Sequence, residues 1–238
     1  MHSKLLEKHG LSNYITGDKY NMNPKLIGDK VNDDIKAIID EMGKKPMSVF
    51  AGVQVHGHNV HYCNPEDYPE TFINTIDDTD GLITDVENVA LIVKFADCTP
   101  VVLFDPVKKV QAVVHSGWRG TVQRISKIAL DKMVNDFGCQ IKDIIAYVGP
   151  SIDIDNYEVG PEVYEAFKDF KTRDKFFKPH GEKYLLSMSG SNIEILLENG
   201  IKEENIEVSQ ESTFNNKSLH SARRDKEGYK LNSMVTII

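Results

Sequence analysis

Residues 89–120 read VALIVKFADCTPVVLFDPVKKVQAVVHSGWRG and contain three short apolar runs, one after another. The runs cover 89–95, 101–104 and 110–114, and each is rich in the β-branched residues that favour strands. An Asp105-Pro106 turn leads from the second run to the third. We therefore predict three core strands within this stretch, and a fourth over the similar apolar run at 48–55.

Helical patterns lie on both sides of these strands. Before them, a helix is predicted with Asn32 as its cap and Gly43 as its stop, because apolar residues recur at helical spacing: Val31, Ile35, Ile38, Ile39 and Met42. After them, a second helix is predicted over 121–137, where one apolar face is followed by Gly138.

The remaining patterns complete the expected fold. Pro161 favours the first turn of a helix, and Ser189 would cap another helix that ends at Gly200. Further strands are predicted at 141–148, 184–186 and 206–208. Strands and helices do not alternate strictly, and no repeat or Pro/Gly-rich linker divides the chain. We therefore expect the α/β fold class, as a single-domain layered sandwich with mixed sheets over residues 1–238.

Composition narrows the classes of function. The 238 residues include 28 basic and 36 acidic side chains, so the net charge of −8 argues against an extended nucleic-acid surface but leaves room for a phosphate pocket. The first residues lack an apolar segment, and no apolar run approaches the roughly 20 residues that span a bilayer. We therefore expect a cytoplasmic protein with no membrane partner. Cys63, Cys98 and Cys139 are expected to be free thiols there.

Three metal-competent side chains follow strand-like runs and precede Gly or Pro: His56, Cys98 and His115. Two imidazoles and one thiolate suit Zn²⁺, and three protein ligands would leave a fourth position for water or substrate. The same donors can hold copper. The three residues lie far apart in the sequence, so the residues alone also allow a buried thiol and two hydrogen-bonded core histidines.

Several longer fragments make a family resemblance specific. In chain order they are QVHG at 54–57, ADCTP at 96–100, VHSGWRG at 114–120, VGPSI at 148–152 with YEVG at 157–160, and SARRD at 221–225. This series resembles the laccase-domain family of purine nucleoside phosphorylases, also called the polyphenol oxidoreductase or peptidoglycan editing factor family, over nearly the whole chain. The resemblance implies an αββα sandwich and a zinc site made by His56, Cys98 and His115.

The resemblance also implies an activity. Members of the family phosphorolyse adenosine, inosine and methylthioadenosine and deaminate adenosine, so purine nucleosides and phosphate are the expected partners. Two departures are visible. The chain has Gln-Glu-Ser-Thr at 210–213, where the family often has a Cys-Thr pair, and the family's Arg-Gly-Gly segment is not evident at 15–18.

Candidates for catalysis lie next to the predicted ligands. Asp97 precedes Cys98 and is either a general base, an orienting group or part of a structural ion pair. Arg119, in the Gly-Trp-Arg-Gly turn, is either a phosphate contact or an anchor of the turn. His58 is a second-choice ligand beside His56. The oligomeric state is not indicated.

Functions of other classes remain open on the residues alone. Cys98 activated by His115 would make a thiol amidase suited to peptidoglycan-precursor editing. A copper-dependent polyphenol oxidase is a further alternative, although multicopper oxidases need several His-x-His pairs and this chain has one. A deaminase of the cytidine type is disfavoured because no Pro-Cys-x-x-Cys element occurs. A non-catalytic zinc protein would need a closed site with four ligands.

Overall fold

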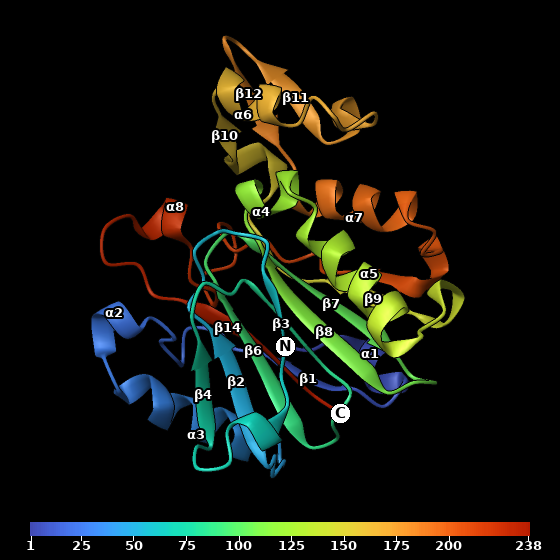
Figure 1. Cartoon of the computed structure of the whole chain (residues 1–238). Coiled ribbons are helices and arrows are strands. Elements are labelled where there is room, and N and C mark those ends of the chain that lie inside the picture. Colours follow the sequence, from blue (N-terminus) through green and yellow to red (C-terminus); the bar gives the residue numbers. More distant parts are fainter.

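Two large mixed sheets lie at the centre of the computed structural model, which describes residues 1–238 (Figure 1). The first sheet has the order β1-β14-β6-β2-β4, from Ser12–Ile15, Asn232–Ile237, Val89–Phe95, Ser48–Gly52 and Ile73–Ile76. The second has the order β13-β9-β7-β8-β5-β3, from Ile206–Val208, Ile145–Val148, Thr99–Asp105, Val110–Ser116, Gly81–Thr84 and Val60–Tyr62. Both combine parallel and antiparallel pairs.

Eight α-helices accompany the sheets. They are α1 (Lys4–Lys8), α2 (Pro24–Ile27), α3 (Lys30–Glu41), α4 (Trp118–Val122), α5 (Ile125–Phe137), α6 (Pro161–Ala166), α7 (Met188–Glu198) and α8 (Ala222–Asp225). Short 3-10 helices cover Pro65–Asp67, Ile141–Asp143, Ile154–Asn156, Arg173–Lys175 and Glu203–Asn205. None of the helices is long and apolar enough to cross a membrane.

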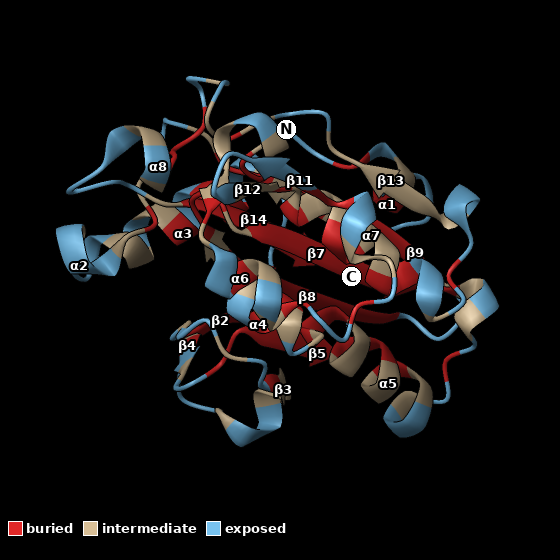
Figure 2. Cartoon of the chain, turned by 90° about the horizontal axis from the view of Figure 1, so that it is seen from above, coloured by how far each residue is buried: buried red, intermediate tan, exposed pale blue.

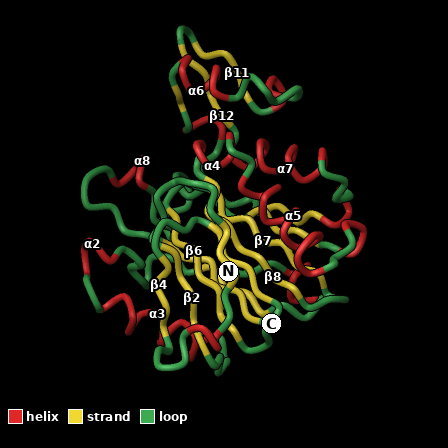
Figure 3. The backbone as a smooth tube through the Cα atoms, viewed as in Figure 1, coloured by secondary structure: helices red, strands yellow, loops and turns green.

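Side-chain alternation along the strands produces the layers. In β6, Leu91 and Val93 face the second sheet and pack with Val102 and Val113, whereas Ile92 faces α3. The outer face of the second sheet packs in the same way against α5 and α7. The order of layers is therefore helix, sheet, sheet, helix, as predicted; the strands are mostly buried and lie between the helices (Figures 2 and 3).

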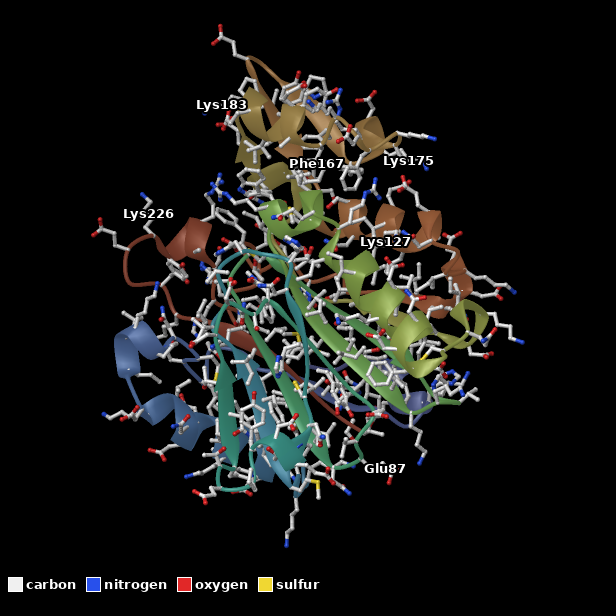
Figure 4. The ribbon with its side chains drawn as sticks, viewed as in Figure 1. Glu87, Lys127, Phe167, Lys175, Lys183 and Lys226 are labelled. Atoms are coloured by element: carbon white, nitrogen blue, oxygen red, sulfur yellow. The ribbon has the colours of Figure 1, made fainter.

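A third, small sheet stands apart at one end, at the top of Figure 1. Its order is β10-β12-β11, from Glu158–Val159, Lys183–Leu186 and Phe177–His180, and α6 packs beside it. An aromatic cluster around Phe167, which is fully buried, forms its core. Lys175 and Lys183 project from its surface (Figure 4).

The predicted strands at 89–95 and 206–208 match the structure, but several boundaries were wrong. The run at 48–55 ends as a strand at Gly52, because the chain then bends into the loop that carries His56. The run at 141–148 starts with a 3-10 turn, so β9 covers only Ile145–Val148.

The predicted helix ends also needed correction. Asn32 lies inside α3, where its N–H already bonds to the Asp29 carbonyl, so it is not the cap. Ser187, not Ser189, caps α7 by accepting from the Gly190 N–H. The helix expected over 121–137 is two helices, because Arg124 adopts a left-handed conformation with φ 59° and ends the continuous hydrogen-bond ladder.

Candidate metal centre

The structure brings the three predicted ligands together. One ligand atom from each of His56, Cys98 and His115 lies within 4.8 Å of the others, and the two imidazole rings meet at 75° with centroids 5.0 Å apart. His56 comes from the loop after β2, Cys98 from the turn between β6 and β7, and His115 from β8. Two nitrogens and one sulfur in this arrangement could hold a metal ion.

Asp80, directly before β5, organises two of the three candidate ligands. Its Oδ1 lies 2.8 Å from Nδ1 of His115 and accepts a bond of 3.0 Å from the His56 N–H. Its Oδ2 accepts bonds of 2.9 Å from the N–H groups of Val55 and Gly57. With Nδ1 bonded to the carboxylate, Nε2 of His115 is left to bind an ion. The four bonds also hold His56 at φ 61°, a conformation that few side chains tolerate.

Two glycines of the Gly-Trp-Arg-Gly turn are required by close packing around the ligands. A Cβ on Gly117 would lie 2.9 Å from Cδ2 of His56 and 3.1 Å from Sγ of Cys98. A Cβ on Gly120 would lie 2.7 Å from the carbonyl oxygen of Gly57. The turn thus packs directly on the loop that carries His56, which explains why the motif contains glycine at both ends.

The electrostatics of the cluster favour a charged sulfur. Burial alone would raise the pKa of the Cys98 thiol, but the charge of His115 and hydrogen bonds from His115 and His56 lower it to about 6. Burial also opposes the charge on His115, yet the Cys98 thiolate and the Asp80 carboxylate raise the pKa of this imidazole. Hydrogen bonds from His115 and the backbone keep the pKa of Asp80 below its usual value despite burial. A thiolate is the form of cysteine that binds metals.

A cavity of about 270 Å³ opens beside the three ligands and extends between the outer face of the first sheet and the α2–α3 layer. Its wall is mainly apolar near α3, with Val31, Ile35 and Ile92. Its polar lining includes Gln54, Thr75, Asn23, Asn32, Lys25 and Lys94. A concave, largely apolar space with a few polar groups is the usual form of a small-molecule site, which typically starts near 300 Å³.

Asp97 lies beside Cys98, but its carboxylate is bonded to the C-terminal part of the chain. Its Oδ1 accepts a bond of 2.6 Å from Thr213 Oγ1, and its Oδ2 accepts one of 2.7 Å from the Arg223 N–H. Both oxygens are therefore occupied. The backbone of Asp97 has φ 81°, which allows the sharp turn from β6 into β7.

The other sequence candidates lie outside the ligand cluster. Arg119 is exposed, its guanidinium carbon lies 4.3 Å from the Trp118 ring centroid, and it does not line the cavity. His58 is exposed and does not join the three ligands. Arg224, in the SARRD fragment at 221–225, anchors the C-terminal loop by donating to the carbonyl oxygens of Thr213 and Leu219.

Asp80 and Lys94 were not identified from the sequence. Asp80 is 35 positions from His115, so only the fold makes them partners. A signal was present, because Thr79-Asp80-Gly81 directly precedes the short apolar run of β5. Lys94 interrupts the otherwise apolar strand 89–95, where a charged residue is unexpected.

Comparison with known proteins places these features in a family. The family described as multi-copper polyphenol oxidoreductase laccase matches residues 9–238. The purine nucleoside phosphorylase YlmD of Bacillus subtilis is 36% identical over 151 residues, which are 62% of this chain and 54% of that protein. Adenosine deaminase RL5 from an unknown prokaryotic organism is 38% identical over 153 residues, 63% of this chain and 58% of that protein. The matched segments thus span little more than half of these relatives.

Solved structures agree with the fold. A Bacillus licheniformis hypothetical protein, YfiH, superposes with a TM-score of 0.85 at 26% identity, covering 92% of this chain and 85% of that one. YlmD from Geobacillus stearothermophilus superposes with a TM-score of 0.88 at 21% identity, covering 99% and 93%. Because the family match spans almost the whole chain and the layered sandwich is shared, the chain belongs to the multi-copper polyphenol oxidoreductase laccase family.

Proposed function

We propose that this protein is a zinc-dependent purine nucleoside phosphorylase that also deaminates adenosine. The observation that carries the proposal is the cluster of three ligands, His56, Cys98 and His115, at the side of a partly apolar cavity. The names of the relatives, purine nucleoside phosphorylase and adenosine deaminase, supply the reaction classes. We further propose that it acts in the cytoplasm, where its three free thiols stay reduced.

Zinc suits the donor set, and a carboxylate supports one of the three ligands. Zinc binds histidine nitrogen and cysteine sulfur, and the carboxylate of Asp80 behind His115 is the usual support for a zinc-bound histidine. Three protein ligands leave one position open. When bound, zinc would supply Lewis acidity to an oxygen atom of a ligand in the cavity.

The proposed phosphorolysis forms one bond at C1 of the ribose and breaks another. An oxygen of phosphate forms a bond to C1 of the ribose, and the bond from C1 to the purine nitrogen breaks with its electron pair going to the base, which takes up a proton. In the deamination, the oxygen of water bonds to C6 of adenosine, the bond from C6 to the amino nitrogen breaks, and a proton of the water passes to that nitrogen, which leaves as ammonia. The apolar wall at Val31, Ile35 and Ile92 offers a surface for a purine ring.

Two further residues are assigned within this proposal. Asp97 acts by positioning Cys98, since both of its carboxylate oxygens already accept hydrogen bonds. For Arg119, the prediction remains that its guanidinium contacts the anionic substrate. Its neighbour Gly117 packs on the ligands, and its guanidinium carries no ion pair in the structure.

The test combines metal analysis with nucleoside assays. We expect about one zinc per chain, and inosine should yield hypoxanthine and ribose 1-phosphate only when phosphate is present. Adenosine should yield inosine and ammonia without phosphate. Cys98→Ala should lose both the metal and the activities. Base release that does not depend on phosphate would indicate a hydrolase and contradict the proposed phosphorylase.

One observation favours a second candidate, a thiol amidase. The lowered pKa of Cys98 and the raised pKa of His115 describe a thiolate beside a protonated imidazole, which is also the pair that activates a cysteine nucleophile. Alkylation distinguishes the two functions. A metal-bound thiolate resists iodoacetamide until a chelator is added, whereas a free nucleophile in the purified protein reacts at once.

A further inference from the structure

Lys94 lies at the end of β6 and projects into the cavity. Alternation along the strand places it on the same face as Ala90 and Ile92, which pack under α3. Gln54 holds this end of the strand, because it accepts a bond of 2.8 Å from the Lys94 N–H and donates one of 2.6 Å to the Lys94 carbonyl oxygen. Lys94 also lines the cavity that contains His56, Cys98 and His115 in its wall.

The ammonium group of Lys94 has no partner in the protein. No carboxylate or other acceptor bonds to it, and burial is the single influence on its pKa, which it lowers. A half-buried ammonium that has lost part of its hydration without gaining an acceptor is unfavourable. This cost is removed if the cavity binds an anion.

The cavity carries the opposite charge to the protein as a whole. Its twenty lining residues include Lys25 and Lys94 but no aspartate or glutamate, although the chain has 36 acidic residues and a net charge of −8. Lys25 is exposed and stays hydrated, whereas Lys94 is half-buried. A cationic, partly apolar cavity in an acidic protein selects an anionic ligand over a neutral one.

We propose that Lys94 binds a phosphate group inside the cavity, beside the metal centre. The inference rests on the proposed function in one respect, namely that phosphorolysis makes inorganic phosphate a substrate. The same ammonium could instead hold the 5′-phosphate of a purine nucleotide. Both sources present a phosphate dianion to one positive charge, and charge-assisted hydrogen bonds of this kind are among the stronger polar contacts.

The experiment compares Lys94→Met with wild type in the zinc-loaded protein. Lys94→Met keeps the length of the side chain and removes the charge, so folding should be preserved. Lys94→Arg keeps a charge, and Lys44→Met removes a charge from an exposed lysine outside the cavity. For each protein we would measure zinc content, the KM for phosphate at saturating inosine, and the KM for inosine at saturating phosphate.

Binding is measured separately from catalysis. Thermal unfolding without nucleoside, at increasing inorganic phosphate or at increasing inosine 5′-monophosphate, reports phosphate binding whether or not the protein is a phosphorylase. We expect Lys94→Met to raise the phosphate KM about 10- to 100-fold and to abolish stabilisation by phosphate. The inosine KM should change less than about threefold, and zinc content should stay the same. Lys94→Arg should recover part of the affinity, and Lys44→Met should match wild type.

The outcomes separate the two proposals. Loss of affinity for inorganic phosphate supports the inference with phosphate as the substrate, and loss for the nucleotide alone supports it with the nucleotide as the ligand. If Lys94→Met binds both as wild type does, the inference is overturned, and the proposed phosphorylase stands if inosine is still cleaved. If wild type cleaves no nucleoside but Lys94→Met loses stabilisation by phosphate, the binding site stands and the phosphorylase fails.

Discussion

Asp80→Asn is the sharpest test of how the metal centre is built. The four hydrogen bonds to Asp80 divide equally, with His56 and His115 on Oδ1 and Val55 and Gly57 on Oδ2. Asparagine has the same shape but only one acceptor oxygen. If that oxygen keeps His115, the side-chain NH₂ of asparagine faces the N–H groups of Val55 and Gly57, and two partly buried donors lose their acceptor.

The magnitude follows from these two donors. Each unpaired buried donor costs roughly 1 to 3 kcal/mol, and the loop at 55–57 is partly exposed, so we expect a loss of about 2 to 4 kcal/mol in the free energy of unfolding. The loop is also the support of His56, and His115 loses its negatively charged partner. The dissociation constant for zinc should therefore rise about 10- to 100-fold.

Two assays measure the effect. Urea unfolding of the metal-free protein gives the stability, and competition with a chelator gives the zinc affinity. Asp77→Asn is the matched control, because Asp77 lies with Asp80 in the loop between β4 and β5, is exposed and makes no side-chain hydrogen bond. If Asp80→Asn binds zinc as tightly as Asp77→Asn, the role of Asp80 in holding the ligands is refuted.

Four further predictions concern other parts of the site. Cys98→Ala should lose the metal, and Cys63→Ala and Cys139→Ala should keep it; metal retained by Cys98→Ala would refute the ligand assignment. In the metal-free protein, the rate of alkylation of Cys98 should rise with pH to half its maximum near pH 6, because the pKa of this thiol is lowered to about 6. Cys139, whose pKa burial raises to about 12, should stay unreactive. A midpoint for Cys98 near the ordinary thiol pKa of about 8.5 would contradict this. Gly120→Ala should cost about 1 to 3 kcal/mol in urea unfolding, because its Cβ would meet the Gly57 carbonyl oxygen at 2.7 Å; an unchanged midpoint would argue against this packing. Asp97→Asn and Thr213→Val should both lower stability, by about 1 to 3 kcal/mol each, and leave the pH profile of kcat unchanged. Thr213→Val removes the donor to Oδ1 of Asp97, and asparagine has one acceptor oxygen for the two donors, Thr213 Oγ1 and the Arg223 N–H. A loss of kcat in Asp97→Asn alone, with normal stability, would identify a general base instead.

The sequence predicted the parts of the fold that depend on local pattern. The run at 89–95 became β6 with the predicted boundaries, because six of its seven residues are apolar, which suits a buried strand. The inner strand β14 was not predicted, since Asn232, Ser233 and Thr236 give it a polar appearance although all six of its residues are buried. Some of its polar side chains form hydrogen bonds in the interior, which offsets the cost of burying them. Asn232, for example, donates to the Phe95 carbonyl oxygen.

The three candidate ligands could be located from fragments of sequence, but the support around them could not. His56, Cys98 and His115 each lie shortly after an apolar run and one or two positions before Gly or Pro, so their positions in the chain are informative. Asp80 and Lys94 act through contacts that the fold creates between distant segments. The local sequence does not indicate that the loop at 55–57 contacts Asp80, because that contact depends on the pairing of β5 with β8 and of β2 with β4.

The crossing from β6 to β7 links the two halves of the proposed site. β6 belongs to the first sheet, whose outer face forms the cavity and whose strand β2 leads into the loop of His56. β7 belongs to the second sheet, where Cys98 directly precedes β7 and His115 lies near the end of β8. Lys94 and Cys98 lie at the two ends of this crossing, and Asp97 ties its middle to the C-terminal segment through Thr213 and Arg223. A shift of the crossing would therefore move the ammonium and the thiolate together, so the distance between a bound anion and the metal ligands is set by one short, well-anchored segment.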